Sequence, residues 1–106
     1  MQSQEEPSGV HAQYIVKTYS IGGLGSGFYL IANVFAKASN ASRFVRELQS
    51  KGLDADFFIN PENNYRYVYL KKHETWTNAL TSYYTKLNAS YDDKMWIMRV
   101  KPNYNS

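Results

Sequence analysis

Residues 65–72 read Tyr-Arg-Tyr-Val-Tyr-Leu-Lys-Lys, and this stretch decides the fold. Successive side chains of a β-strand point to opposite faces, so the alternating pattern predicts one tyrosine-lined face, with Val68 and Leu70 on the other. Pro61-Glu62-Asn63-Asn64 comes directly before it and is typical of a tight turn, because Pro fixes φ and Asn tolerates the left-handed region. The three tyrosines that share a face are Tyr65, Tyr67 and Tyr69.

Strand and helix signals alternate on the N-terminal side of this stretch. Leu53–Asn60 alternates between apolar and polar residues and predicts the strand that pairs across the turn. Before it, apolar residues at helical spacing predict a helix capped by Ser39 or Asn40 and ended by Gly52. Phe28–Ala36 is rich in β-branched and aromatic residues and predicts the first strand.

The C-terminal side repeats the pattern. Thr75 is placed to cap a second helix, whose apolar residues continue to Leu87, and Lys94–Lys101 predicts a fourth strand that Pro102 ends. The order βαββαβ predicts an α+β, ferredoxin-like fold, in which a four-stranded antiparallel sheet carries both helices on one face. The opposite face is then bare unless something binds to it.

The first 27 residues differ from the rest. Val10–Ile21 contains enough β-formers for one extra strand or a packed extension, and residues 22–27 hold four of the six glycines, which break any regular element. We therefore expect a linker or N-terminal extension over 1–27, a folded domain over 28–101 and a tail over 102–106. We also expect the chain to be a fragment of a longer protein.

The composition excludes several classes of function. The 106 residues include 10 Tyr, 2 Trp and 5 Phe but no Cys, so a Cys-based zinc site or thiol nucleophile is excluded. Neither a nucleophile elbow nor a phosphate-binding loop is present, and His11 and His73 are far apart in sequence. We expect no catalysis, no cofactor and no metal. No apolar run reaches the ~18–20 residues that span a bilayer, so no membrane contact is expected.

Strand alternation assigns side chains to the bare face. In the first strand Leu30 and Ala32 suit the helix-covered face, and in the fourth strand Trp96, Met98 and Val100 are predicted to face the helices. An exposed aromatic face normally marks an interaction site. Its expected members are Tyr29, Ile31, Asn33, Phe58, Tyr65, Tyr67, Tyr69, Ile97 and Arg99. An alternative is that the segment Val10–Ile21 covers this face.

One family with this order of elements is the RNA-recognition motif, which stacks bases on aromatic residues of the sheet. The stretch after the turn resembles its signature only partly. Asn63 stands for the basic residue, Asn64 for the glycine, Arg66 for the small residue and Leu70 for the final aromatic. The formal net charge of +3 is also mild for a protein that binds a polyanion.

From Phe28 to Lys101 the chain more closely resembles a SPOR domain, the sporulation-related repeat. The resemblance lies in an aromatic first strand ending in Phe35, the pair Asn40-Ala41 at the first helix, and Tyr65-Arg66 opening the third strand. Further matches are Gly52-Leu53-Asp54-Ala55, Ala79 and Met98-Arg99-Val100. The chain departs from the family at Ile31, at Asn33-Val34 and at Lys71-Lys72-His73.

The resemblance implies a non-catalytic module for septal peptidoglycan that recognises glycan strands lacking stem peptides. It also implies a place in the periplasm or cell envelope, as a monomeric domain of a larger exported protein. The expected glycan-binding residues are Tyr29, Ile31, Asn33, Tyr65, Tyr67, Tyr69 and Arg99, with Phe58, Arg66, Lys71 and Lys72 at the rim. Single-stranded RNA binding and protein–protein docking on the same face remain the alternatives.

Overall fold

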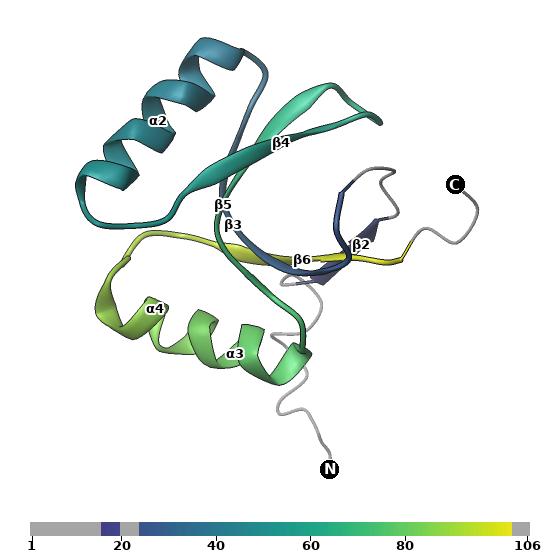
Figure 1. The fold of residues 1–106 in the computed structure, drawn as a ribbon, viewed down its shortest axis with the longest axis vertical. Coiled ribbons are helices and arrows are strands. Elements are labelled where there is room, and N and C mark those ends of the chain that lie inside the picture. Colours follow the sequence, from purple (N-terminus) through teal and green to yellow (C-terminus); the bar gives the residue numbers. More distant parts are fainter. Residues whose placement is uncertain (1–15, 20–23, 103–106) are drawn as a thin grey trace.

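The computed structural model describes residues 16–19 and 24–102 (Figure 1). The described elements follow the predicted order, with one strand added at the start and a short turn after the second helix. In chain order they are β2 (Val16–Tyr19), β3 (Gly27–Phe35), α2 (Ala38–Ser50), β4 (Asp56–Asn60), β5 (Tyr65–His73), α3 (Trp76–Tyr84), α4 (Lys86–Ala89) and β6 (Trp96–Val100).

The sheet has the strand order β2-β6-β3-β5-β4. β3 is central and pairs antiparallel with both β5 and β6, while β4 pairs antiparallel with β5 at one edge. These four strands and the helices α2 and α3 reproduce the predicted ferredoxin-like arrangement. We call the side of the sheet that packs against the helices the helix side, and the opposite side the open face.

An extra strand lies at the edge of the sheet. β2 runs parallel to β6, with Val16 opposite Ile97 and Tyr19 opposite Val100. The strand expected within the N-terminal extension is therefore present over four residues, as an addition to the sheet edge. The remainder of Val10–Ile21 lies outside the described residues.

The first helix begins earlier than the sequence predicts. α2 starts at Ala38, and its N-cap residue Lys37 makes no side-chain capping hydrogen bond, so neither Ser39 nor Asn40 is the cap. The helix ends as expected. Gly52 has a positive φ of 89°, and the bonds from Gly52 N to Gln49 O and from Leu53 N to Leu48 O form a Schellman motif.

The second helix is capped as predicted but ends sooner. The Thr75 side chain accepts a hydrogen bond from Asn78 N, and α3 ends at Tyr84. The four residues of α4 then all have positive φ, between 53° and 67°, so this turn is left-handed. A left-handed turn places Cβ close to the following carbonyl oxygen and costs about 1–2 kcal/mol per residue other than glycine. Its members are Lys86, Leu87, Asn88 and Ala89.

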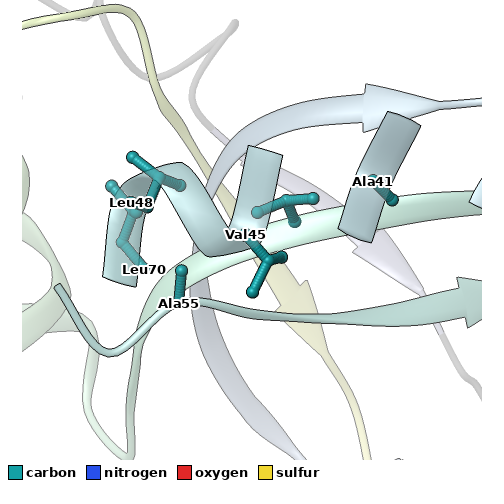
Figure 2. Close-up of a cluster of buried hydrophobic side chains, with 6 residues drawn as sticks. Ala41, Val45, Leu48, Ala55 and Leu70 are labelled. Atoms are coloured by element: carbon teal, nitrogen blue, oxygen red, sulfur yellow. The ribbon is translucent and has the colours of Figure 1, made fainter. Parts of the chain in front are cut away.

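The core on the helix side joins both helices to the central strands. In Figure 2, α2 points Ala41, Val45 and Leu48 toward Ala55 and Leu70. A neighbouring group of fully buried residues, Leu30, Ala79 and Ile97, packs α3 against β3 and β6. Burial of this apolar surface, at roughly 25 cal/mol per Å², is what holds the helices on this side of the sheet.

The last strand has the opposite orientation to the one predicted. Ile97, expected on the bare face, is fully buried on the helix side beside Leu30. Trp96, Met98 and Val100, expected to face the helices, pack on the open face. Apolar side chains lie on both faces of β6, Ile97 on one and Met98 on the other, so their alternation alone does not distinguish one orientation from the other.

Candidate functional site

Five aromatic rings lie in contact on the open face of the sheet. We call them the aromatic cluster; its members are Tyr29, Phe58, Tyr67, Tyr69 and Trp96. They come from β3, β4, β5 and β6, so the cluster crosses all four strands of the ferredoxin-like sheet. Tyr29 and Tyr67 are buried, whereas Phe58, Tyr69 and Trp96 are partly exposed. The partly exposed rings form the surface that a ligand would meet.

Ring geometry makes the cluster continuous. Phe58 and Tyr67 stack with an interplanar angle of 16° and a centroid separation of 5.5 Å, because they lie opposite one another on β4 and β5. Trp96 meets Tyr67 edge-to-face at 6.3 Å, and Tyr29 meets Tyr69 edge-to-face at 5.1 Å. Such pairs contribute about 0.5–1.5 kcal/mol each beyond the area that they bury. The rings are therefore held in fixed orientations before any ligand arrives.

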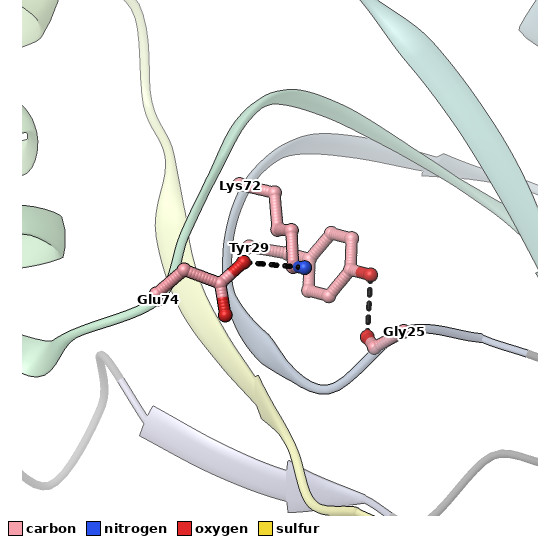
Figure 3. Close-up of polar contacts among 4 residues, drawn as sticks. All are labelled: Gly25, Tyr29, Lys72 and Glu74. Carbon is pink, nitrogen blue, oxygen red and sulfur yellow. Dashed lines mark hydrogen bonds and ion pairs between the residues drawn. The ribbon is translucent and has the colours of Figure 1, made fainter.

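Tyr29 lies on the predicted face, but its side chain is buried beneath the surface. Its side chain is 3 % exposed, and its hydroxyl donates a 2.6 Å hydrogen bond to the Gly25 carbonyl oxygen (Figure 3). Burial, with smaller contributions from Tyr69 and Glu74, raises the Tyr29 pKa to about 12. Leu24 packs against the same group of side chains. The chain before β3 thus covers this end of the open face, and Tyr29 supports the surface from beneath.

Lys72 is the rim residue whose placement agrees with the prediction. It lies opposite Tyr29 across β3 and β5, and its ammonium group forms a 2.7 Å ion pair with Glu74 (Figure 3). Gly27 leaves room for the lysine stem, since a Cβ there would lie 2.7 Å from Lys72 Cε. Tyr69 lies close enough that Lys72 lowers its pKa, although burial and Asp56 outweigh this and raise it.

A β-bulge in β3 places Asn33 on the helix side. Ile31 lies opposite Tyr69 and Asn33 lies opposite Val68, so Ala32 is the extra residue. Cross-strand partners share a face, and Val68 is buried on the helix side. The predicted role of Asn33 as an amide donor on the open face is therefore wrong. Its Oδ1 accepts a hydrogen bond from Val34 N instead.

Three basic residues that were predicted to contact the glycan also lie on the helix side. Arg99 lies opposite Phe28, with its guanidinium carbon 5.8 Å from the centre of that ring. Arg66 donates to the carbonyl oxygens of Ala36 and Asn64. Lys71 lies opposite Leu30, which is buried against α3. Their strand positions, not their charge, decide which face they occupy.

The remaining predicted residues lie on the open face but differ in how exposed their side chains are. Ile31 is on the open face but fully buried, and Tyr67 is 5 % exposed, so both lie beneath the accessible rings. Tyr65 is 45 % exposed at the start of β5. Phe58, predicted only for the rim, is at the centre of the cluster.

The hairpin between β4 and β5 fixes one end of the cluster. Asn63 Nδ2 donates a 2.9 Å hydrogen bond to the Tyr67 hydroxyl, and Asn63 Oδ1 accepts from Tyr65 N. Asn60 is fully buried, and its Oδ1 accepts from Glu62 N. Asn64 adopts the left-handed conformation (φ 65°) expected of this turn. The asparagines thus set the turn geometry that aligns Tyr65 and Tyr67.

Trp96 joins the aromatic cluster although the sequence predicts it on the helix side. The difference arises because β6 has the opposite orientation to the one predicted. Arg99 is the polar residue of β6, and a charged side chain is expected to face solvent. Arg99 is indeed exposed, but on the helix side.

Over residues 16–19 and 24–102, the side chains form no group of three or more His, Asp or Glu that could hold a metal ion. No helix in the same part of the chain is long and apolar enough to cross a membrane. Comparisons of the chain with protein-family models, with curated proteins and with solved structures find no match.

Proposed function

We propose that this domain is a non-catalytic module that binds peptidoglycan at the septum, recognising glycan strands that lack stem peptides. The observation that carries the proposal is the aromatic cluster on the open face. Sugar rings have apolar C–H faces that lie against aromatic rings, while their hydroxyl and N-acetyl groups take hydrogen bonds. The resemblance to SPOR domains supports the same conclusion and favours a periplasmic or envelope location within a larger exported protein.

The surface proposed for glycan contact differs from the set expected from sequence. It consists of the accessible rings of Phe58, Tyr65, Tyr69 and Trp96, with Lys72 at the rim. Ile31, Tyr29 and Tyr67 hold these rings from below. Lys72 offers a cation for a lactyl carboxylate of the glycan, in competition with Glu74.

The distribution of charge disfavours the RNA alternative. Single-stranded nucleic acid binding needs cations that follow the phosphates alongside the stacking rings. Arg66, Lys71 and Arg99 lie on the helix side, and Lys72 is already paired with Glu74. A neutral or weakly acidic polymer therefore suits the open face better than a polyanion does.

The test is co-sedimentation with sacculi. The domain should pellet with amidase-treated sacculi more than with untreated sacculi, and Tyr65→Ala and Tyr69→Ala should each weaken this binding at least about fivefold. Ile59→Ala is a matched control, because Ile59 is 46 % exposed and Tyr65 45 %, on opposite faces of the paired strands β4 and β5.

Three outcomes would contradict the proposal. Equal binding to both kinds of sacculi would show that stem peptides are not sensed. A gel shift with oligo-RNA that weakens steeply with salt would favour the nucleic-acid function. A stable dimer by light scattering, broken by Tyr65→Ala, would favour protein docking on this face.

A further inference from the structure

A hollow lies away from the centre of the open face, where α3 ends and β6 begins. Its volume is about 490 Å³, within the roughly 300–1,000 Å³ range of ligand pockets. Two kinds of side chain converge on it, aromatic rings and charged groups. The residues that matter here are Tyr83, Tyr84, Lys86, Asp93, Lys94 and Trp96.

The aromatic wall is formed by consecutive residues of α3 together with the first residue of β6. Tyr83 and Tyr84 meet edge-to-face with ring centroids 5.1 Å apart. Tyr84 is 56 % exposed, the highest value among the large apolar side chains of the described residues. Trp96 closes the wall and also belongs to the aromatic cluster. Flat rings around a hollow of this size suit the apolar face of a sugar ring.

The charged groups are two lysines and one aspartate. Lys86 and Lys94 lie on separate segments, the left-handed turn and the residue that leads into β6, and both are exposed. Asp93 Oδ1 accepts a hydrogen bond from Lys94 N, which fixes the carboxylate at the rim. The excess of positive charge favours an anionic ligand, and the carboxylate offers an acceptor for a hydroxyl group.

The backbone at Lys86 is held in an unusual conformation. Lys86 is the first of four consecutive left-handed residues, and hydrogen bonds from Ala89 N to Thr85 O and from Tyr91 N to Lys86 O close the turn. Strained backbone of this kind persists only where surrounding structure over-determines it, and it is concentrated at ligand sites. Here it presents a lysine beside the tyrosines.

We infer that this pocket binds a sugar unit that carries a carboxylate. The ring would lie against Tyr84 and Trp96, and the carboxylate would be held between Lys86 and Lys94. This site shares Trp96 with the glycan surface proposed above, whereas Tyr84, Lys86 and Lys94 lie outside that surface.

Two sugars that differ by one carboxylate-bearing group test the inference. N-acetylmuramic acid is N-acetylglucosamine with a lactyl ether added. Titrated into the ¹⁵N-labelled chain, the acid should shift the amide resonances of residues 83–96, and the neutral sugar should bind at least about tenfold more weakly. Equal affinity for the two sugars, or no binding of the acid, would overturn the inference.

Two matched pairs of variants test whether Lys86 and Lys94 account for the binding of the acid. Lys86→Met with Lys94→Met removes both ammonium groups but keeps the apolar stems, and should weaken binding of the acid about tenfold or more. Lys37→Met with Lys51→Met makes the same charge change at the two ends of α2 and should leave it unaltered. If both pairs behave alike, the pocket is not the site. Tyr84→Ala removes a ring that is 56 % exposed and should also weaken binding.

The same titration separates this inference from the proposed function. Tyr65→Ala should weaken binding to amidase-treated sacculi yet leave the binding of N-acetylmuramic acid intact. Loss of that binding in Tyr65→Ala would place the sugar on the open face and overturn the second site.

Discussion

The hydroxyl of Tyr29 donates a 2.6 Å hydrogen bond to the carbonyl oxygen of Gly25, four residues before it. This bond ties the chain that precedes β3 to the open face, where it covers one end of the aromatic cluster. The tyrosine that sequence analysis placed on the surface is consequently part of the support for that surface. The accessible area of the open face is set by Phe58, Tyr65, Tyr69 and Trp96.

Tyr29→Phe should lower the free energy of unfolding by about 1 kcal/mol, because it leaves the Gly25 carbonyl without this donor. It should also reduce the loss of stability that occurs at alkaline pH. The folded pKa of Tyr29 is about 12 against an ordinary value of 10.0, so the folded state keeps a proton that the unfolded chain loses. Stability should therefore be unaffected by this group below pH 10 and fall as pH rises from 10 to 12.

Urea unfolding at pH 8 to 11.5 checks both parts of this prediction. The wild-type curve should decline above pH 10, and Tyr29→Phe should decline less. Burial, followed by the charge of Asp56, also raises the pKa of Tyr69, so some alkaline dependence will remain in the variant. Parallel pH profiles for the two proteins would contradict the assignment to Tyr29.

Gly27→Ala should destabilise the domain by about 1–3 kcal/mol. Gly27 has φ 150°, and an added Cβ would lie 2.8 Å from the carbonyl oxygen of His73 as well as 2.7 Å from Lys72 Cε. The lysine can move, but the backbone oxygen of β5 cannot. Gly25→Ala is the matched control, because its Cβ would meet only ordinary contacts at 3.6 Å and beyond. Thermal melts of the two variants should differ clearly, and equal melting temperatures would refute the argument.

Local signals in the sequence were sufficient for the fold. The alternation in residues 65–72, the turn before it, the Thr75 cap and the Gly52 ending each correspond to a feature of the structure. Each of them is determined by neighbours within a few residues along the chain. The first helix begins earlier than expected because α2 starts without a side-chain cap, and an uncapped start leaves no signal in the sequence.

The candidate site was predictable only in part, because it depends on which face of the sheet each side chain occupies. Tyr67 and Tyr69 were placed correctly, since β5 pairs regularly with β4. Asn33 was not, because the bulge at Ala32 shifts the alternation within β3. Trp96 was not predicted, because apolar side chains lie on both faces of β6 and the exposed Arg99 lies on the helix side. A bulge and the orientation of a strand that is apolar on both faces are tertiary properties, and alternation in one sequence does not encode them.

Ala89→Gly should raise the free energy of unfolding by about 1 kcal/mol, because φ at this position is 67° and glycine adopts this conformation without the Cβ penalty. The side chain is exposed, so little packing is lost. Ala38→Gly makes the same chemical change at an exposed position in the right-handed helix α2, and should instead destabilise by up to about 1 kcal/mol. Denaturant midpoints measured side by side check the opposite signs. If Ala89→Gly also destabilises, the turn is not left-handed in solution.

His73 should make the domain less stable in mild acid. Its Nε2 lies 2.7 Å from the Ser82 hydroxyl, which links the end of β5 to α3. Burial, followed by the charge of Lys71, lowers the pKa of this imidazole below its ordinary value of 6.5. Between that value and the lower folded pKa, the unfolded chain binds a proton that the folded state does not. Stability conferred by the neutral ring is therefore present above pH 6.5 and is lost as pH falls through this window.

His73→Gln should remove this component of the acid dependence, because the amide does not titrate, and the free energy of unfolding between pH 7 and 5 should become flatter. For one proton the slope is at most about 1.4 kcal/mol per pH unit, so chemical denaturation at half-unit intervals resolves it. Ser82→Ala is the control that separates the hydrogen bond from the charge. It should lower stability at every pH while leaving the slope in place. A wild-type profile with no decline below pH 6.5, or an unchanged slope in His73→Gln, would exclude His73 as the titrating group.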